Sequence, residues 1–124
     1  MRRLYEPQLA WGGNERTADT KGATTVPLLR FAMIVKAPGY DPKDHNALLS
    51  APAFTTRVVC VSSLEQARDA ASALVREGVQ LIELCGGFAP EEADQLHAHI
   101  DHQVPVGVVR YAPEELEHLS VLFN

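Results

Sequence analysis

The chain has 124 residues, a mass of 13.6 kDa and a formal net charge of -5. It is long enough for one domain with a two- or three-layer core, and its hydrophobic fraction of 46% is ordinary for a soluble globular protein. A negative net charge, without any run of basic residues, argues against sequence-independent nucleic-acid binding, which needs a basic surface. The apolar runs are strand-sized and no apolar segment follows the basic residues at positions 2 and 3, so we expect neither a membrane span nor a signal peptide. Cys60 and Cys85 do not require a disulfide, and a reduced, cytoplasmic protein is the simpler expectation.

Residues 1–27 differ in composition from the rest of the chain. Their second half is rich in Gly, Thr, Asp and Lys and has no sustained hydrophobic period. We therefore predict an N-terminal extension that is mobile or docks on a partner. Docking stays open because several residues are too apolar for a merely solubilising tail: Leu4, Tyr5, Leu9 and Trp11. Residues 28–124 are predicted to form a single α/β domain.

Strand-like and helix-like segments alternate from Leu28 onward. An apolar run over residues 28–37 predicts the first strand, which Pro38 and Gly39 end. Residues 41–49 predict a short helical segment, and the β-branched residues 55–61 predict the second strand. Ser62 and Ser63 stand three residues before Glu65 and Gln66, which is the spacing of a helix capping box, and Gly78 predicts the end of that helix.

The second half of the chain continues the alternation. Residues 79–85 predict the third strand, Pro90 and the acidic residues after it predict the next helix, and residues 104–111 predict the fourth strand. Pro113 predicts the start of a last helix whose apolar residues face the core: Leu116, Leu119 and Phe123. Four strand–helix units predict a flavodoxin-like α/β fold, a small open parallel sheet of about four strands with helices on its faces. The unpaired edges of such a sheet favour a homo-oligomer.

Open α/β sheets bind ligands beyond the carboxyl ends of their strands, and residues 79–90 would place reactive side chains at that edge. There a carboxylate, Glu83, and a thiol, Cys85, precede two glycines and a helix. With the spatial strand order 2-1-3-4, Glu83 would lie between Lys36 and Arg110. This arrangement predicts either a structural ion-pair network or a carboxylate held by two cations beside an anion site, available as a general base.

The candidate catalytic residues are Glu83, Cys85 and His45. Cys85 precedes a helix N-terminus, which can make a thiol a nucleophile or proton donor, although cysteine is also a favoured core residue. His45 lies in the segment that leaves the same end of the sheet and could act as an acid or base, with a helix-surface histidine as the alternative. The candidate substrate-binding residues follow the same strand ends: Lys36, Gly86, Gly87, Phe88, Arg110 and Tyr111. The two glycines would leave backbone N–H groups open to an anion or enolate, or simply allow a tight turn.

No cofactor or metal site is expected. The chain has no G-x-G-x-x-G and no G-x-x-x-x-G-K pattern, so we predict no dinucleotide and no P-loop nucleotide. His97, His99 and His102 cluster, but only the last two share a helix face and no third ligand is evident. A solvated helix face is the expected arrangement.

Three stretches together resemble a known family. They are residues 31–42 with His45, residues 82–88 with the sequence I-E-L-C-G-G-F, and residues 104–107 with Arg110. In this combination the chain resembles, over about residues 28–111, the small bacterial proteins catalogued as domain of unknown function 6506. The typical form has glycine after Phe88, where this chain has Ala89. The resemblance implies a compact α/β fold and lends no established reaction and no catalytic residue.

We therefore expect a cofactor-independent small-molecule enzyme of lyase, isomerase or cyclase type, which uses acid–base chemistry on an anionic or carbonyl-bearing metabolite. Arg110 and Lys36 would hold the anion, the glycine amides would stabilise developing negative charge, and Glu83 or Cys85 would move the proton. The alternatives are a non-catalytic metabolite-binding or regulatory module and an oligomeric assembly subunit. The expected partners are a small-molecule ligand and further copies of the chain, with no nucleic acid and no membrane.

Overall fold

The computed structural model describes residues 25–122. In chain order its elements are β1 (Arg30–Lys36), β2 (Asn46–Ala51), β3 (Phe54–Val61), α2 (Leu64–Arg76), β4 (Leu81–Leu84), α3 (Pro90–His99), β5 (Val106–Val108), the 3-10 helix η1 (Pro113–Glu115) and α4 (Leu116–Ser120). None of the helices within these residues has the length and hydrophobicity needed to cross a membrane. Residues 1–24 of the predicted N-terminal extension lie outside the described residues, so its docking on a partner stays a prediction.

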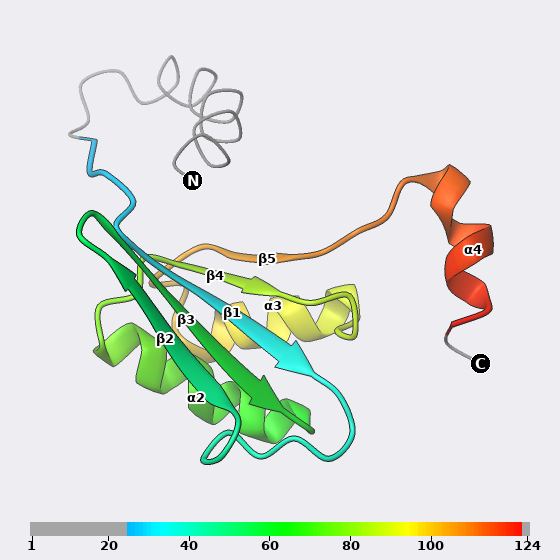
Figure 1. Ribbon diagram of the computed structural model, residues 1–124, viewed down its shortest axis with the longest axis horizontal. Helices are drawn as coiled ribbons and strands as arrows, with labels where there is room; N and C mark the ends of the chain where they lie inside the picture. Colours follow the sequence, from blue (N-terminus) through cyan, green and yellow to red (C-terminus); the bar gives the residue numbers. More distant parts are fainter. Residues whose placement is uncertain (1–24, 123–124) are drawn as a thin grey trace.

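The strands form one mixed sheet in the order β2-β3-β1-β4-β5 (Figure 1). Neighbouring strands from β3 to β5 are parallel, whereas β2 is antiparallel to β3. The α/β fold is confirmed, and the four parallel strands have the spatial order considered from the sequence. The flavodoxin-like repeat of four strand–helix units is not found, because residues 46–51 form an edge strand where a short helix was predicted. Alanine and leucine in this segment favour a helix in isolation, and pairing with β3 overrides that weak preference.

The two long helices start and stop where local chemistry predicts. Ser63 is the N-cap of α2, and its Oγ accepts a hydrogen bond from the backbone N–H of Gln66 at 3.1 Å. Gly78 follows the end of α2 with a φ of +93°, a conformation that glycine adopts without strain. Pro90 occupies the first turn of α3, as predicted.

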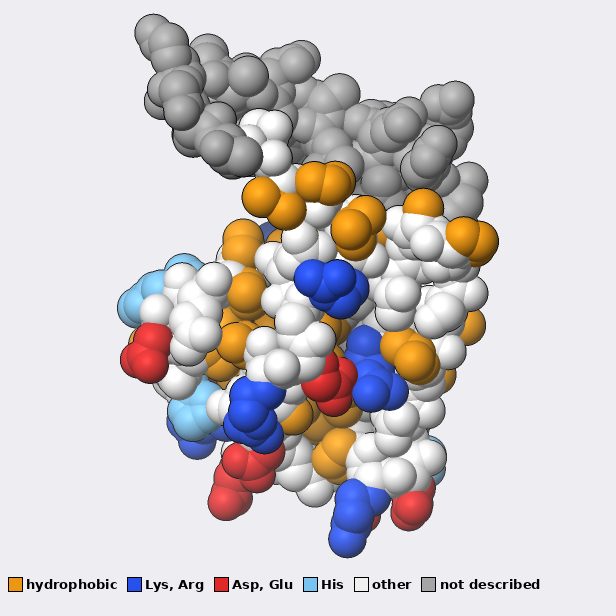
Figure 2. Space-filling model, turned by 90° about the vertical axis from the view of Figure 1, so that its left-hand side faces the viewer, with side chains coloured by type: hydrophobic (Ala, Val, Ile, Leu, Met, Phe, Trp, Pro, Cys, Tyr) orange, Lys and Arg blue, Asp and Glu red, His pale blue; other side chains and the backbone are white. Residues whose placement is uncertain are grey.

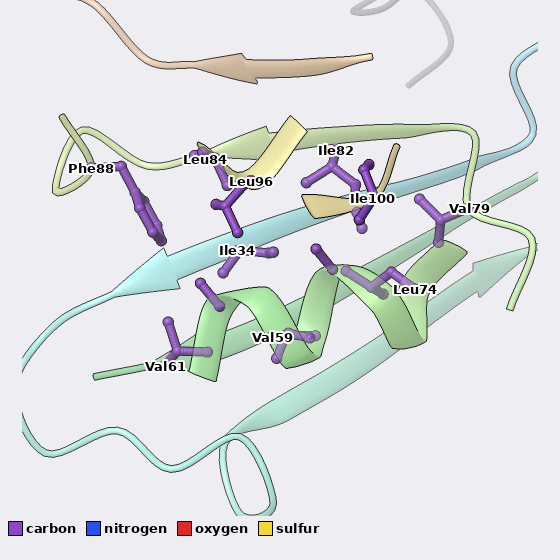
Figure 3. Close-up of a cluster of buried hydrophobic side chains, with 14 of the residues drawn as sticks. Ile34, Val59, Val61, Leu74, Val79, Ile82, Leu84, Phe88, Leu96 and Ile100 are labelled. Carbon is purple, nitrogen blue, oxygen red and sulfur yellow. The ribbon is translucent and has the colours of Figure 1, made fainter. Parts of the chain in front are cut away.

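Both long helices lie on the same face of the sheet (Figure 1). Alternate strand residues such as Ile34, Val59 and Ile82 point toward them and form one buried cluster with Leu74 of α2 and Leu96 of α3 (Figure 3). The prediction of helices on both faces was therefore wrong. The other set of alternate residues forms what we call the open face, which no helix of residues 25–122 covers. Phe31 belongs to this face but is only 6% exposed. The partly or fully exposed members are Met33, Val35, Ala47, Leu49, Ala51, Phe54, Thr56, Val58, Cys60, Leu81, Glu83 and Gly107.

The C-terminal segment leaves the body of the molecule. After β5 the chain is extended, and α4 projects away from the sheet and the other helices (Figure 1). Leu116 is 51% exposed, so the prediction that it faces the core was wrong; Phe123 lies outside the described residues. The fourth strand, predicted over residues 104–111, is shorter than expected because only Val106–Val108 pair with β4.

Candidate functional site

Glu83 is the one charged residue that the strands of the described chain place on the open face. In the sheet register it lies between Met33 of β1 and Gly107 of β5. A Cβ atom built on Gly107 would meet no atom within 4 Å, so there is free space beside the carboxylate. Within residues 25–122, no hydrogen bond or ion pair reaches the Glu83 carboxylate. Burial among its neighbours raises the pKa of Glu83 above the ordinary glutamate value.

Lys36 does not approach Glu83 and instead binds a carboxylate of α3. Its Nζ lies 3.1 Å from both carboxylate oxygens of Glu92. The predicted placement of Glu83 between Lys36 and Arg110 was wrong, because Glu83 is level with Met33 along the strands and residues 33 and 36 of β1 point to opposite faces. Sequence reasoning noted Glu92 only as an acidic residue at a helix start, although its position three residues after Ala89 is a signal for a capping role.

Glu92 also caps α3. Its Oε1 accepts a hydrogen bond from the backbone N–H of Ala89 at 2.8 Å. That bond, and then the hydrogen bond and positive charge of Lys36, lower the pKa of Glu92 below the ordinary glutamate value. The Lys36–Glu92 pair, which we call the β1–α3 clip, thus joins the end of a central strand to the first turn of a helix.

Cys85 is held in the turn between β4 and α3. Its Sγ accepts hydrogen bonds from the backbone N–H groups of Lys36 at 3.3 Å and Gly87 at 3.4 Å. The thiol is partly buried and packs against the core cluster. A Cβ atom at Gly87 would lie 2.9 Å from the carbonyl oxygen of Lys36, so this close approach requires glycine.

Tyr111 and Arg110 lie after β5, at the same end of the sheet. A Cβ atom at Gly86 would lie 3.2 Å from Cε2 of Tyr111, so the glycine allows the tyrosine ring to rest on this turn. Arg110 is exposed, and its Nη1 donates a hydrogen bond to the carbonyl oxygen of Val109 at 3.0 Å. Within the described residues its guanidinium forms no salt bridge, so it is free to meet an anionic ligand.

Two predicted site residues lie away from Glu83. Phe88 is 2% exposed and belongs to the core (Figure 3), with Nζ of Lys36 4.9 Å from its ring centroid. Its predicted contact with substrate is not supported by this buried position. His45 immediately precedes β2, three strand positions from β4, which corresponds to about 14 Å at the usual strand spacing. Its Nδ1 accepts a hydrogen bond from the backbone N–H of Asp41 at 2.9 Å.

A groove on the helix side of β2 was missed by sequence reasoning. It has a volume of about 340 Å³, and none of the predicted site residues lines it. Its polar lining is mixed in charge: Lys43, Asn46, Arg57, Gln66, Asp69 and Glu77. It was missed because β2 was expected to be a helix, and no local signal marks it. The mixture of charges is not confined to this groove. Figure 2 looks onto the end of the sheet where the parallel strands begin, and acidic and basic side chains lie next to one another there as well.

The histidines at the end of α3 are arranged differently from the expectation. The rings of His97 and His102 are 4.3 Å apart, edge to face, because the chain turns back after the helix with a φ of +57° at His102. Within the described residues, no group of three or more His, Cys, Asp or Glu side chains is arranged to hold a metal ion.

Residues 29–124 match the model of a family described as a family of unknown function (DUF6506). The match includes every residue of the candidate site and begins one residue before β1. No curated protein and no solved structure matches the chain.

Proposed function

Because this chain belongs to the family of unknown function DUF6506, we propose a function from its own residues: a cofactor-independent small-molecule enzyme of lyase, isomerase or cyclase type. The observation that carries the proposal is the carboxylate of Glu83, half-buried on an apolar sheet face without a partner among the described residues. A structural carboxylate in such a place is normally paired, so an unpaired one is a candidate for chemistry.

The environment of Glu83 suits a proton carrier. Burial raises its pKa above the ordinary glutamate value, which makes the carboxylate a stronger base for accepting a proton. The free space at Gly107 leaves room for a substrate beside the carboxylate. The apolar side chains of Met33 and Leu81 reduce the water around it, which strengthens electrostatic interactions with a bound molecule.

The substrate class follows from the groups near this end of the sheet. Glu83 would remove a proton from a carbon next to a carbonyl group, and the electron pair of the broken C–H bond would move onto the carbonyl oxygen as an enolate. The resulting carboxylic acid would return the proton to another carbon in an isomerisation or to a leaving group in an elimination. Arg110 would attract an anionic group of the substrate. Lys36 is given no such role because Glu92 already binds it.

The test is proton exchange, because it does not require the full reaction to be known. A panel of small oxo- and hydroxycarboxylates is incubated with the protein in D₂O, and loss of the C–H signal is followed by NMR. We expect Glu83→Gln to slow exchange by about 100-fold or more, and Glu91→Gln, an exposed carboxylate on α3, to leave it unchanged. Gly107→Val should also slow exchange, because it fills the space beside the carboxylate. Equal exchange by wild type and Glu83→Gln would refute the proposal.

A non-catalytic metabolite-binding module is the second candidate function. The observation that favours it is Arg110, whose guanidinium is exposed and forms no salt bridge with the described residues. In this case an anionic ligand from the same panel raises the melting temperature of wild type but not of Arg110→Ala, and no C–H exchange occurs.

A further inference from the structure

The groove on the helix side of β2 has the size of a small-molecule site. Helix α2 packs against β1 and β3, and Leu48, which points to this side from β2, is 56% exposed. The groove of about 340 Å³ occupies the space between β2 and α2. Pockets that bind small molecules typically measure about 300 to 1,000 Å³, so the groove lies at the lower end of that range.

The floor of the groove is apolar. Val59 of β3 and Ala70 and Leu74 of α2 are 9%, 8% and 2% exposed, and Ala73 lines the groove beside them. The two alanines have small side chains, so α2 leaves room above the sheet where larger residues would fill it. An apolar group of a ligand would therefore be taken out of water on this floor, which favours its binding.

The wall opposite α2 is the loop before β2, and internal hydrogen bonds hold its shape. The backbone N–H of Lys43 donates to Oδ1 of Asp41 at 2.9 Å, and Nδ2 of Asn46 donates to the carbonyl oxygen of Pro42 at 2.8 Å. Nδ1 of His45 accepts a further hydrogen bond from the backbone N–H of Asp41 at 2.9 Å. Because this wall is formed without a ligand, binding need not order it, and the cost of binding is lower.

Two opposite charges at one end of the groove have no partner among residues 25–122. Lys43 and Asp69 both line the groove, and neither forms a salt bridge with these residues. Glu77 stands further along α2, about 12 Å from Asp69 at the usual helix rise. It binds Arg57, with Nη2 of the arginine 3.4 Å from Oε1 of the glutamate. The unpaired cation and the unpaired anion are therefore at the end away from this ion pair.

We propose that the groove binds an α-amino acid with an apolar side chain. The ligand carboxylate binds Nζ of Lys43, its ammonium group binds the carboxylate of Asp69, and its side chain lies on the apolar floor at Val59. Gln66 lines the groove, and its Oε1 is already hydrogen-bonded, so its Nε2 is a second donor for the ligand carboxylate. A ligand with both charges on one carbon atom pairs with both protein charges, whereas a ligand with one charge leaves one of them unpaired. The groove and Glu83 are on opposite sides of the sheet, so this site does not depend on the proposed proton transfer.

The test is a ligand titration of the full, isotope-labelled chain, followed by the backbone amide signals in NMR. L-Leucine is the probe, and three analogues each lack one of its groups: isocaproate lacks the ammonium group, isoamylamine lacks the carboxylate, and glycine lacks the side chain. N-Acetyl-leucinamide, which is neutral, represents a leucine inside a peptide chain. The positions of the shifted amides locate the site, and their concentration dependence gives the dissociation constant.

We expect L-leucine to shift amides of the loop before β2 and of α2, with a dissociation constant below about 1 mM. Each analogue and N-acetyl-leucinamide should bind at least about 10-fold more weakly, because each has lost a charged contact or the buried side chain.

Matched variants test the proposed contacts. Asp69→Asn and Lys43→Gln should each raise the dissociation constant for L-leucine by about 10-fold, the effect of removing a hydrogen bond to a charged group. The controls Glu65→Gln and Asp44→Asn, exposed neighbours outside the groove lining, should leave it unchanged. Ala73→Leu should abolish binding because it fills the groove. Leucine is a good helix former, so circular dichroism should show that this variant keeps its fold.

Five results would overturn the proposal. The first is the absence of shifts with L-leucine at concentrations up to about 10 mM, well above the expected dissociation constant. The second is a set of shifts that lies away from the groove. The third is equal binding of isocaproate or isoamylamine, which would show that one charge is enough. The fourth is equal binding of N-acetyl-leucinamide, which would show that the groove takes a peptide segment. The fifth is unchanged binding by Asp69→Asn, Lys43→Gln and Ala73→Leu.

Discussion

Protonation of the Glu83 carboxylate links the stability of the fold to pH. Its pKa is raised by burial, so the folded chain binds this proton more tightly than the unfolded chain. Its contribution to stability is therefore fully present below the unfolded-state pKa and is lost as pH rises through the folded-state pKa. Glu83→Gln stays neutral at every pH. We expect the variant to gain stability relative to wild type between pH 4 and pH 7, as measured by urea unfolding; a difference that does not change with pH would show that Glu83 is solvated.

Between elements, the clip joins the end of β1 to the first turn of α3. Lys36 and Glu92 are 22% and 24% exposed, so the pair is shielded more than a surface ion pair. Glu92 stabilises the fold at pH values above the unfolded-state pKa of glutamate, and this contribution is lost as pH falls through its lowered folded-state pKa. We expect Glu92→Gln to lower the free energy of unfolding by about 1–2 kcal/mol at pH 7, and by less in acid.

The capping and ion-pair parts of the clip can be separated. Lys36→Met should remove the ion pair and keep the hydrogen bond from Ala89 to Glu92, so it should cost less than Glu92→Gln. Urea unfolding of both single variants and the double variant gives the coupling energy. A coupling energy near zero would mean that the two residues stabilise the fold independently.

For the whole molecule, a homo-oligomer of the kind expected from the unpaired sheet edges would make stability depend on protein concentration. A native dimer that unfolds to monomers is favoured by mass action, so its melting temperature should rise with concentration. We expect this rise for wild type, measured by scanning calorimetry. A wild-type melting temperature that is the same at every concentration would contradict an oligomer coupled to folding.

The sequence predicted most of the elements because their signals are local. Gly78 and Pro90 end and begin helices as predicted, and the start of α2, predicted at Ser62 or Ser63, lies at Ser63. The candidate site was predicted less well. Lys36, Glu83 and Arg110 do come to the same part of the sheet, but strand register decides which side chains share a face, and no local signal reports it.

The sequence by itself determined the α/β class and the turn that carries Cys85, because these follow from hydrophobic periodicity and from residues with special backbone preferences. The order of the parallel strands was only assumed, and the structure shows it. The tertiary structure decided three further features: the antiparallel edge strand β2, the choice of Glu92 as the partner of Lys36, and the placement of both long helices on one face. Each depends on contacts between residues far apart in the chain. The free energy of such contacts lies in packing and pairing, which outweigh the small conformational preferences of single residues.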